Sequence, residues 1–224
     1  MTETIEDLFF YGVFAADLFV IIQILFFLKP FKRIKTIWFV LSICIFNSLF
    51  NIISLILPDK AHYFNNALFT IVEYAIFAAI FYRISVNEKY KKAIIFSSLI
   101  FLGIVIFNFN PSAKNFDSLP IGVETILIMI YCFYYLYEQM NDLSDSFIYN
   151  RYHFWIAIGI LIYLGGSFFI YLFAEKAGSK ILDDYWFLTY VFYIVKNVFF
   201  AIGIANLIAQ NKKSKTFRIK PHSN

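Results

Sequence analysis

The sequence predicts an all-α membrane protein, a bundle of seven transmembrane helices. Of its 224 residues, 61% are hydrophobic and 15% are charged, whereas soluble domains carry about 25% charged residues. Seven stretches stay apolar over the roughly 20 residues that a helix needs to cross a bilayer. Because backbone polar groups inside a membrane must be satisfied within the segment, each stretch is expected to be helical.

Prolines mark the ends of these stretches. Pro30 follows the first, Pro58 ends the second, Pro111 follows the fourth, and Pro120 lies in the first turn of the fifth, where a helix tolerates proline. The expected helices cover residues 8–28, 36–57, 62–84, 93–109, 117–139, 153–174 and 185–209. They form one membrane domain over residues 1–211, followed by a basic tail over 212–224.

Lysine and arginine are distributed unevenly between the connections. They are frequent in the first and third connections and in the tail, and Arg151 lies in the fifth. The alternate connections hold few, namely Lys60, Lys114, Lys176 and Lys180, and the N-terminal segment holds none. Cytoplasmic loops carry the excess of basic residues. The sequence therefore predicts an N-terminus outside and a C-terminus in the cytoplasm.

The tryptophans and cysteines fit the same arrangement. Trp38, Trp155 and Trp186 each lie near an expected helix end, where tryptophans gather at the membrane interface. Cys44 and Cys132 fall inside apolar spans, so we expect two buried thiols without a disulfide.

Lys196 is the most informative residue because it lies near the middle of the last span, in VFYIVKNVFFAIGIANLI. A charge at that depth costs roughly 2.5–3.5 kcal/mol on insertion scales, so it normally faces the bundle interior and has a partner. Glu73 lies at a similar depth, roughly 16 Å from the outer end at 1.5 Å per residue. The sequence predicts an ion pair between Lys196 and Glu73, with Asp17 as the competing partner.

Helical spacing collects the other polar residues into inward-facing stripes, as on the second span, where Asn47 and Asn51 are four residues apart. These stripes predict a polar pocket that opens to the outside. The expected ligand-binding residues are Asp17, Asn47, Asn51, Asn66, Glu73, Glu124, Tyr193 and Lys196. Two alternatives are that these groups only hold the helices together, or that Lys196 has a covalent role.

Catalytic and metal-binding motifs are missing from the sequence. Its histidines are His62 at the outer edge, His153 at the cytoplasmic edge and His222 in the tail, a spacing unsuited to one metal site. We expect no enzymatic activity, no metal and no cofactor. The charge of the tail does not by itself indicate nucleic-acid binding.

A lysine in the seventh span and a carboxylate in the third resemble the microbial rhodopsins, in which the lysine carries retinal and the carboxylate is its counter-ion. That resemblance implies a photoreceptor with Lys196 and Glu73 in these roles. Three departures disfavour it. Phe192 stands where the family has an aspartate, the third span lacks an interior arginine, and the sixth lacks the tryptophan–tyrosine–proline pattern that packs retinal.

The segments NALFTIVEYAIFAAIFYRI, FWIAIGILIYLGGSFFIYLF and YIVKNVFFAIGIA resemble small bacterial seven-helix membrane proteins of uncharacterised function. This resemblance implies a multi-pass protein of the bacterial inner membrane, with Glu73 and Lys196 as the matching positions. Similar helix sets precede signalling modules, which this sequence lacks. We therefore expect a sensor- or receptor-like protein that signals through a separate cytoplasmic or membrane partner.

Two other functions stay open. In a transporter of three-plus-one-plus-three helices, Asp17 would correspond to Glu124 and Glu73 to Lys196. Transporter sites usually lie on helices interrupted by glycine or proline, and no span here has a proline deep inside it. A structural or accessory subunit without a ligand is the third possibility. The sequence does not indicate the oligomeric state.

Overall fold

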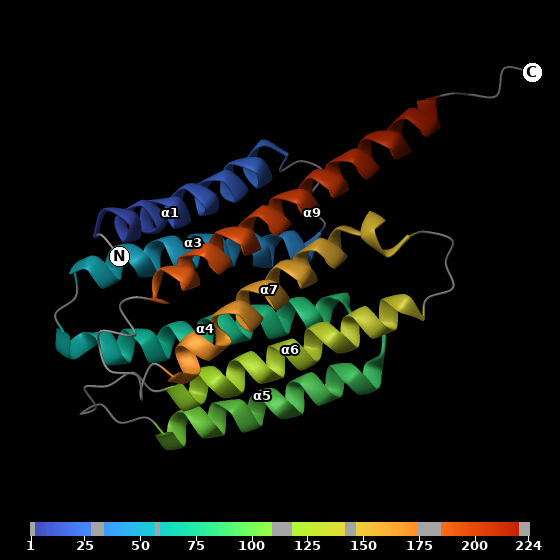
Figure 1. Ribbon diagram of the computed structural model, residues 1–224. Helices are drawn as coiled ribbons and strands as arrows, with labels where there is room; N and C mark the ends of the chain where they lie inside the picture. Colours follow the sequence, from blue (N-terminus) through green and yellow to red (C-terminus); the bar gives the residue numbers. More distant parts are fainter. Residues whose placement is uncertain are drawn as a thin grey trace, which may run out of the picture.

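The computed structural model describes residues 3–27, 34–56, 59–108, 118–141, 147–173 and 185–219. Within these ranges it contains no strand. The elements are α1 (Glu3–Phe26), α3 (Lys35–Ile56), α4 (Asp59–Ile84), α5 (Glu88–Asn108), α6 (Ser118–Met140), the short η1 (Ile148–Asn150), α7 (Tyr152–Phe173) and α9 (Phe187–Ile219) (Figure 1). Seven of these helices are long and apolar enough to cross a membrane. The prediction of an all-α, multi-pass membrane protein with seven spanning helices is confirmed.

The last helix differs most from its expected range. Its apolar span ends at Asn211, but the helix continues to Ile219 into the segment expected to be a basic tail. Between Asn211 and Pro221 the chain contains no proline or glycine, so no helix-breaking residue ends the helix there. Residues 220–224 of the tail lie outside the described part of the chain.

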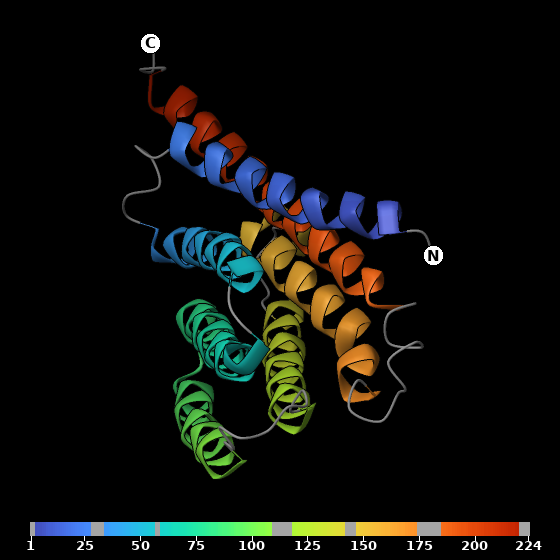
Figure 2. The same ribbon diagram turned by 90° about the vertical axis from the view of Figure 1, so that its left-hand side faces the viewer.

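Six helices form a closed ring in which each packs against the next, in the order α1, α3, α4, α6, α7 and α9, with α9 returning to α1. Helix α5 lies outside this ring, against α4 and α6 (Figure 2). We call the end of the bundle where α1, α4, α6 and α9 begin the cavity end. The end where α3, α5 and α7 begin is the basic end.

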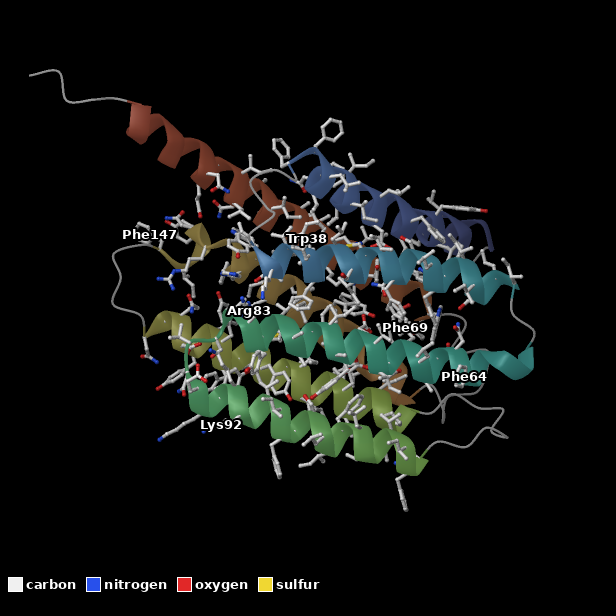
Figure 3. All side chains as sticks on the ribbon, turned by 180° about the vertical axis from the view of Figure 1, so that it is seen from behind. Trp38, Phe64, Phe69, Arg83, Lys92 and Phe147 are labelled. Carbon is white, nitrogen blue, oxygen red and sulfur yellow. The ribbon has the colours of Figure 1, made fainter. Side chains whose placement is uncertain are left out.

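Basic side chains gather at the basic end. Among the side chains that the structure describes, every lysine and arginine except Lys196 lies there. Figure 3 shows Arg83 and Lys92 at the end that also holds Phe147, opposite Phe64. Five other lysines used to predict the orientation lie in connections outside the described residues, namely Lys29, Lys32, Lys114, Lys176 and Lys180.

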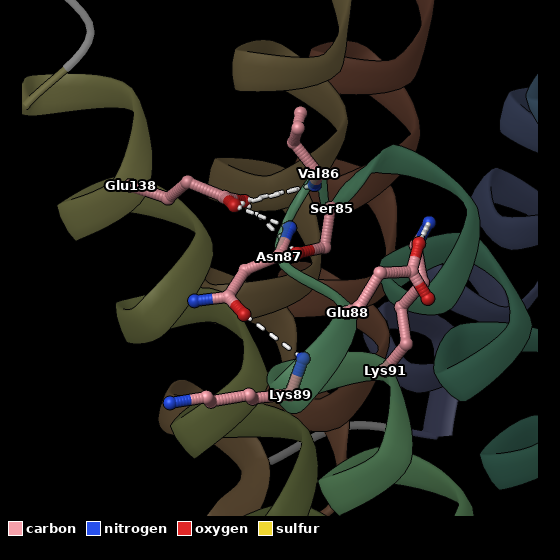
Figure 4. A network of polar contacts seen from close by, with 7 residues as sticks. All are labelled: Ser85, Val86, Asn87, Glu88, Lys89, Lys91 and Glu138. Carbon is pink, nitrogen blue, oxygen red and sulfur yellow. Dashed lines mark hydrogen bonds and ion pairs between the residues drawn. The ribbon is translucent and has the colours of Figure 1, made fainter.

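At the basic end, the carboxylate of Glu138 on α6 connects α4 to α5 (Figure 4). It accepts hydrogen bonds from the Ser85 hydroxyl at 3.0 Å and from the backbone N–H of Asn87 at 2.9 Å. The Asn87 side chain in turn accepts from the Lys89 N–H at 2.9 Å, as an N-cap residue does at the start of a helix. These bonds satisfy backbone groups that would otherwise be unpaired where α5 begins.

Two glycines lie where the backbones of α7 and α9 come close together. A Cβ atom added to Gly159 would lie 2.9 Å from the Phe199 Cβ and 3.0 Å from the backbone oxygen of Lys196. A Cβ on Gly203 would lie 3.0 Å from the backbone oxygen of Tyr152. Small residues let membrane helices pack backbone to backbone, so Gly159 sets the position of the helical turn that carries Lys196.

We predict that Gly159→Ala lowers the free energy of unfolding by about 1–3 kcal/mol, because the added methyl group must push α7 and α9 apart. Unfolding by denaturant in detergent micelles measures this loss. The matched control is Gly103→Ala on α5, where an added Cβ meets nothing within 4 Å. That change should be neutral or stabilise by up to about 1 kcal/mol through helix propensity. Equal losses for the two variants would contradict the close-packing argument.

Candidate functional site

A cavity of about 300 Å³ lies inside the ring, in the half nearer the cavity end. All six ring helices, together with Trp186 directly before α9, contribute to its wall. The lining residues are Phe10, Val13, Asn47, Phe50, Asn51, Ser54, Leu55, Asn66, Phe69, Thr70, Glu73, Ile121, Glu124, Tyr163, Trp186, Thr189, Tyr190 and Tyr193. Its volume is at the lower end of the range for small-molecule sites.

The structure brings most of the predicted site residues to this cavity. Its wall includes Asn47, Asn51, Asn66, Glu73, Glu124 and Tyr193. The remaining two, Asp17 and Lys196, do not line it and lie about one helical turn further along α1 and α9 than the lining residues Val13 and Tyr193. Their role in ligand binding stays a prediction.

Asp17 is the centre of a buried hydrogen-bond network under the cavity. The side chain is fully buried. Its carboxylate accepts from the Tyr193 hydroxyl at 2.7 Å, from the Asn197 amide at 2.8 Å and from the Ser48 hydroxyl at 3.1 Å. Asn47 donates to the Tyr193 oxygen at 2.7 Å. Hydrogen bonds to one carboxylate therefore join α1, α3 and α9 at one level of the bundle. Hydrogen bonds to an ionised carboxylate are stronger than those between neutral groups.

Lys196 is also fully buried, but it does not form the direct ion pair expected from the sequence. Its ammonium makes no ion pair or hydrogen bond within the described residues. It lies instead over aromatic rings, with Nζ 3.7 Å from the centroid of Tyr193 and 4.6 Å from that of Tyr163. The side chain folds over the ring of Tyr193, one turn back on the same helix, and the hydroxyl of that tyrosine bonds Asp17.

Both carboxylates still compensate the lysine through space. Glu73 has the strongest electrostatic interaction with Lys196, and Asp17 has the next. The sequence therefore identified the interacting charges, but not that aromatic rings surround the ammonium. A cation over a desolvated aromatic face gains about 2 kcal/mol, which offsets part of the cost of the missing contact.

Three acceptor atoms on the cavity residues have no hydrogen-bond partner among the residues that the structure describes. They are Oδ1 of Asn47, Oε1 of Glu73 and Oε1 of Glu124. These side chains are at most 3% exposed. The other oxygen of Glu73 accepts one long hydrogen bond, 3.5 Å, from Tyr163. Buried polar atoms are rarely left unpaired, so these oxygens mark where a ligand or water would bind.

Sequence reasoning missed several contributors to the site. Asn197 lies four residues after Tyr193, so helical spacing alone would have placed it on the same stripe. Ser48 lies three residues before Asn51 and so borders the stripe predicted on that span, whereas Tyr163 lies in an apolar span on which no polar stripe was predicted. Trp186, expected as an interfacial residue, lines the cavity.

The cysteines and the other possible metal ligands among the described residues form neither a disulfide nor a metal site. Cys44 and Cys132 are free and buried, as predicted. No group of three or more histidine, cysteine, aspartate or glutamate side chains is arranged to hold a metal ion in the part of the chain that the structure describes.

Comparisons of the chain with protein-family models, with curated proteins and with solved structures found no match.

Proposed function

We propose that this membrane protein is a receptor or sensor that takes a small solute into the cavity and signals through a separate protein. The observation that carries this proposal is a cavity, lined by carboxyl, amide and aromatic side chains, that ends inside the bundle. Below its inner end lie Asp17 and Lys196, which both contact the lining residue Tyr193. Beyond that layer the ring is filled by fully buried apolar side chains such as Ile24 and Phe81.

Helix α9 supplies a physical connection from the cavity to the other end of the bundle. It contributes Tyr193 to the wall and Lys196 to the layer beneath the cavity, and it packs along both α1 and α7. In Figure 1 its C-terminal part projects past the ends of the neighbouring helices. A ligand that displaces Tyr193 would move this projecting helix, which is the natural surface for a partner.

The proposal includes the orientation. The basic end would face the cytoplasm, because cytoplasmic segments of membrane proteins carry the excess of lysine and arginine. The cavity end would then face the outside of a bacterial inner membrane. A solute would enter from outside, and α9 would present its C-terminal part to a cytoplasmic or membrane partner.

Thiol labelling tests the one-sided access. In a background of Cys44→Ala and Cys132→Ala, we predict that Ser54→Cys on the cavity wall reacts with a charged, membrane-impermeant thiol reagent added outside intact cells. The matched control is Ala201→Cys on α9, a buried position outside the cavity, which should stay unlabelled from either side. Labelling of Ser54→Cys from the cytoplasmic face alone would refute the orientation.

The arrangement of the helices supports transport as a second candidate. The first three and last three spanning helices occupy consecutive halves of the ring, and the fourth, α5, lies outside it. This is the order expected for a three-plus-one-plus-three transporter. Labelling of Ser54→Cys from both faces, with flux of a small solute into proteoliposomes, would favour transport over sensing.

A further inference from the structure

We infer that the cavity binds a small organic cation, a protonated amine attached to a short aromatic or apolar group. This inference rests on the proposed function in one respect, because it requires that a solute can reach the cavity. The charge balance, the unpaired atoms and the aromatic walls each support it separately.

The first observation is the charge balance of the interior. The buried side chains that the structure describes include three carboxyl groups, on Asp17, Glu73 and Glu124, and one ammonium group, on Lys196. Asp17 is satisfied by three hydrogen-bond donors. Glu73 and Glu124 both line the cavity and interact electrostatically with each other. The cavity therefore holds two neighbouring carboxyl groups and no cationic side chain in its lining, so an added cation would let both carboxyl groups ionise.

The second observation is the kind of atom left unpaired. The unpartnered oxygens of Asn47, Glu73 and Glu124 all belong to lining residues. Ionised carboxylates only accept hydrogen bonds, and an amide oxygen does the same. An ammonium group offers three N–H donors and a charge of the right sign. An anionic ligand would be repelled by the carboxylates, and an apolar one would leave the oxygens unpaired.

Lys196 does not supply these donors to the cavity. It is absent from the lining, and its Nζ lies over the ring of Tyr193, which does line the cavity. The positive charge is therefore held behind aromatic rings, while the carboxylates of Glu73 and Glu124 face the space directly.

The third observation is the aromatic wall. Phe10, Phe50, Phe69, Tyr163, Trp186 and Tyr190 line the cavity together with Tyr193. Faces of aromatic rings attract cations, and cages of such rings recognise ammonium ligands. Two neighbouring carboxyl groups can also relieve repulsion by sharing a proton or binding a metal ion, but neither would use these rings. The described residues hold no metal-ligating cluster of three or more.

The test compares three molecules of similar shape on the unmodified protein in lipid nanodiscs, by isothermal titration calorimetry, with empty nanodiscs subtracted. The probes are 2-phenylethylammonium, the neutral 2-phenylethanol and the anionic phenylacetate. We expect the ammonium to bind about tenfold or more tightly than the alcohol, and phenylacetate not to bind. Glu124→Gln should remove most of that preference. The control Glu88→Gln, an exposed carboxylate paired with Lys91 on α5, should keep it.

Equal binding of the alcohol and the ammonium overturns the inference, and so does binding of none of the three probes. Stabilisation by Na⁺ at millimolar concentration to the same extent as by the ammonium would also overturn it, in favour of an inorganic cation. The comparison of probes needs no variant, so a poorly folding Glu124→Gln protein does not affect it. Outside-only labelling of Ser54→Cys would still support the receptor proposal if the cation failed to bind.

Discussion

Lys196→Met is expected to lower the free energy of unfolding by about 3–5 kcal/mol, because it leaves buried carboxylates without their countercharge. Lys196 is the one buried basic side chain among those that the structure describes, and Glu73 and Asp17 both interact with it electrostatically. Unfolding in detergent micelles measures the loss. The control is Lys91→Met, at a surface ion pair with Glu88, where the expected change is within about 1 kcal/mol.

Double-mutant cycles can identify which carboxylate interacts more strongly with Lys196. Glu73→Gln combined with Lys196→Met should cost less than the sum of the single changes, by about 0.5–3 kcal/mol. The cycle of Asp17→Asn with Lys196→Met should give a smaller coupling energy, because Asp17 is the weaker electrostatic partner. Additive effects in both cycles would show that the ammonium is stabilised by the rings of Tyr163 and Tyr193 rather than by the carboxylates.

The second large effect is expected at Asp17. Asp17→Leu removes the acceptor for Tyr193, Asn197 and Ser48 together, so two buried donors and one partly buried donor lose their partner. We expect a loss of about 3–5 kcal/mol. Interhelical hydrogen bonds in membrane proteins average about 0.6 kcal/mol each, so three ordinary bonds would account for about 2 kcal/mol. A loss above that value indicates a network whose members act together.

Two controls accompany this measurement in the same micelles. Ser48→Ala, which removes one donor, should cost about 1 kcal/mol. Leu18→Ala, at a 53% exposed position next to Asp17 on α1, should have a small effect. If Asp17→Leu costs no more than Ser48→Ala, the hydrogen bonds of Asp17 do not hold α1 to α9. The layer beneath the cavity would then not be rigid.

The inward-facing polar residues could be predicted because helical periodicity is a local property. Asn47 and Asn51 on α3, like Asn66 and Glu73 on α4, repeat at the spacing of one helix face, and the structure places all four on the cavity wall. The cost of a charge in lipid likewise required Lys196 and Asp17 to be buried. Both are fully buried.

Contacts between helices could not be predicted in the same way. All seven helices have similar length and hydropathy, so nothing in the sequence selects α5 for the position outside the ring. The prediction of a direct ion pair between Lys196 and Glu73 was wrong. Equal depth does not fix the direction of a flexible side chain, and in the structure that side chain lies over Tyr193.

The sequence by itself determined that this chain has seven membrane-spanning helices and which of their polar residues avoid the lipid. These properties depend on local hydrophobicity and on a repeat of 3.6 residues. The tertiary structure decided which helices are neighbours, that Asp17 rather than Lys196 collects the hydrogen bonds, and that Glu73 and Glu124 face one cavity. These depend on close packing between distant segments, such as the contact of Gly159 with α9, and on side-chain directions that local sequence does not set.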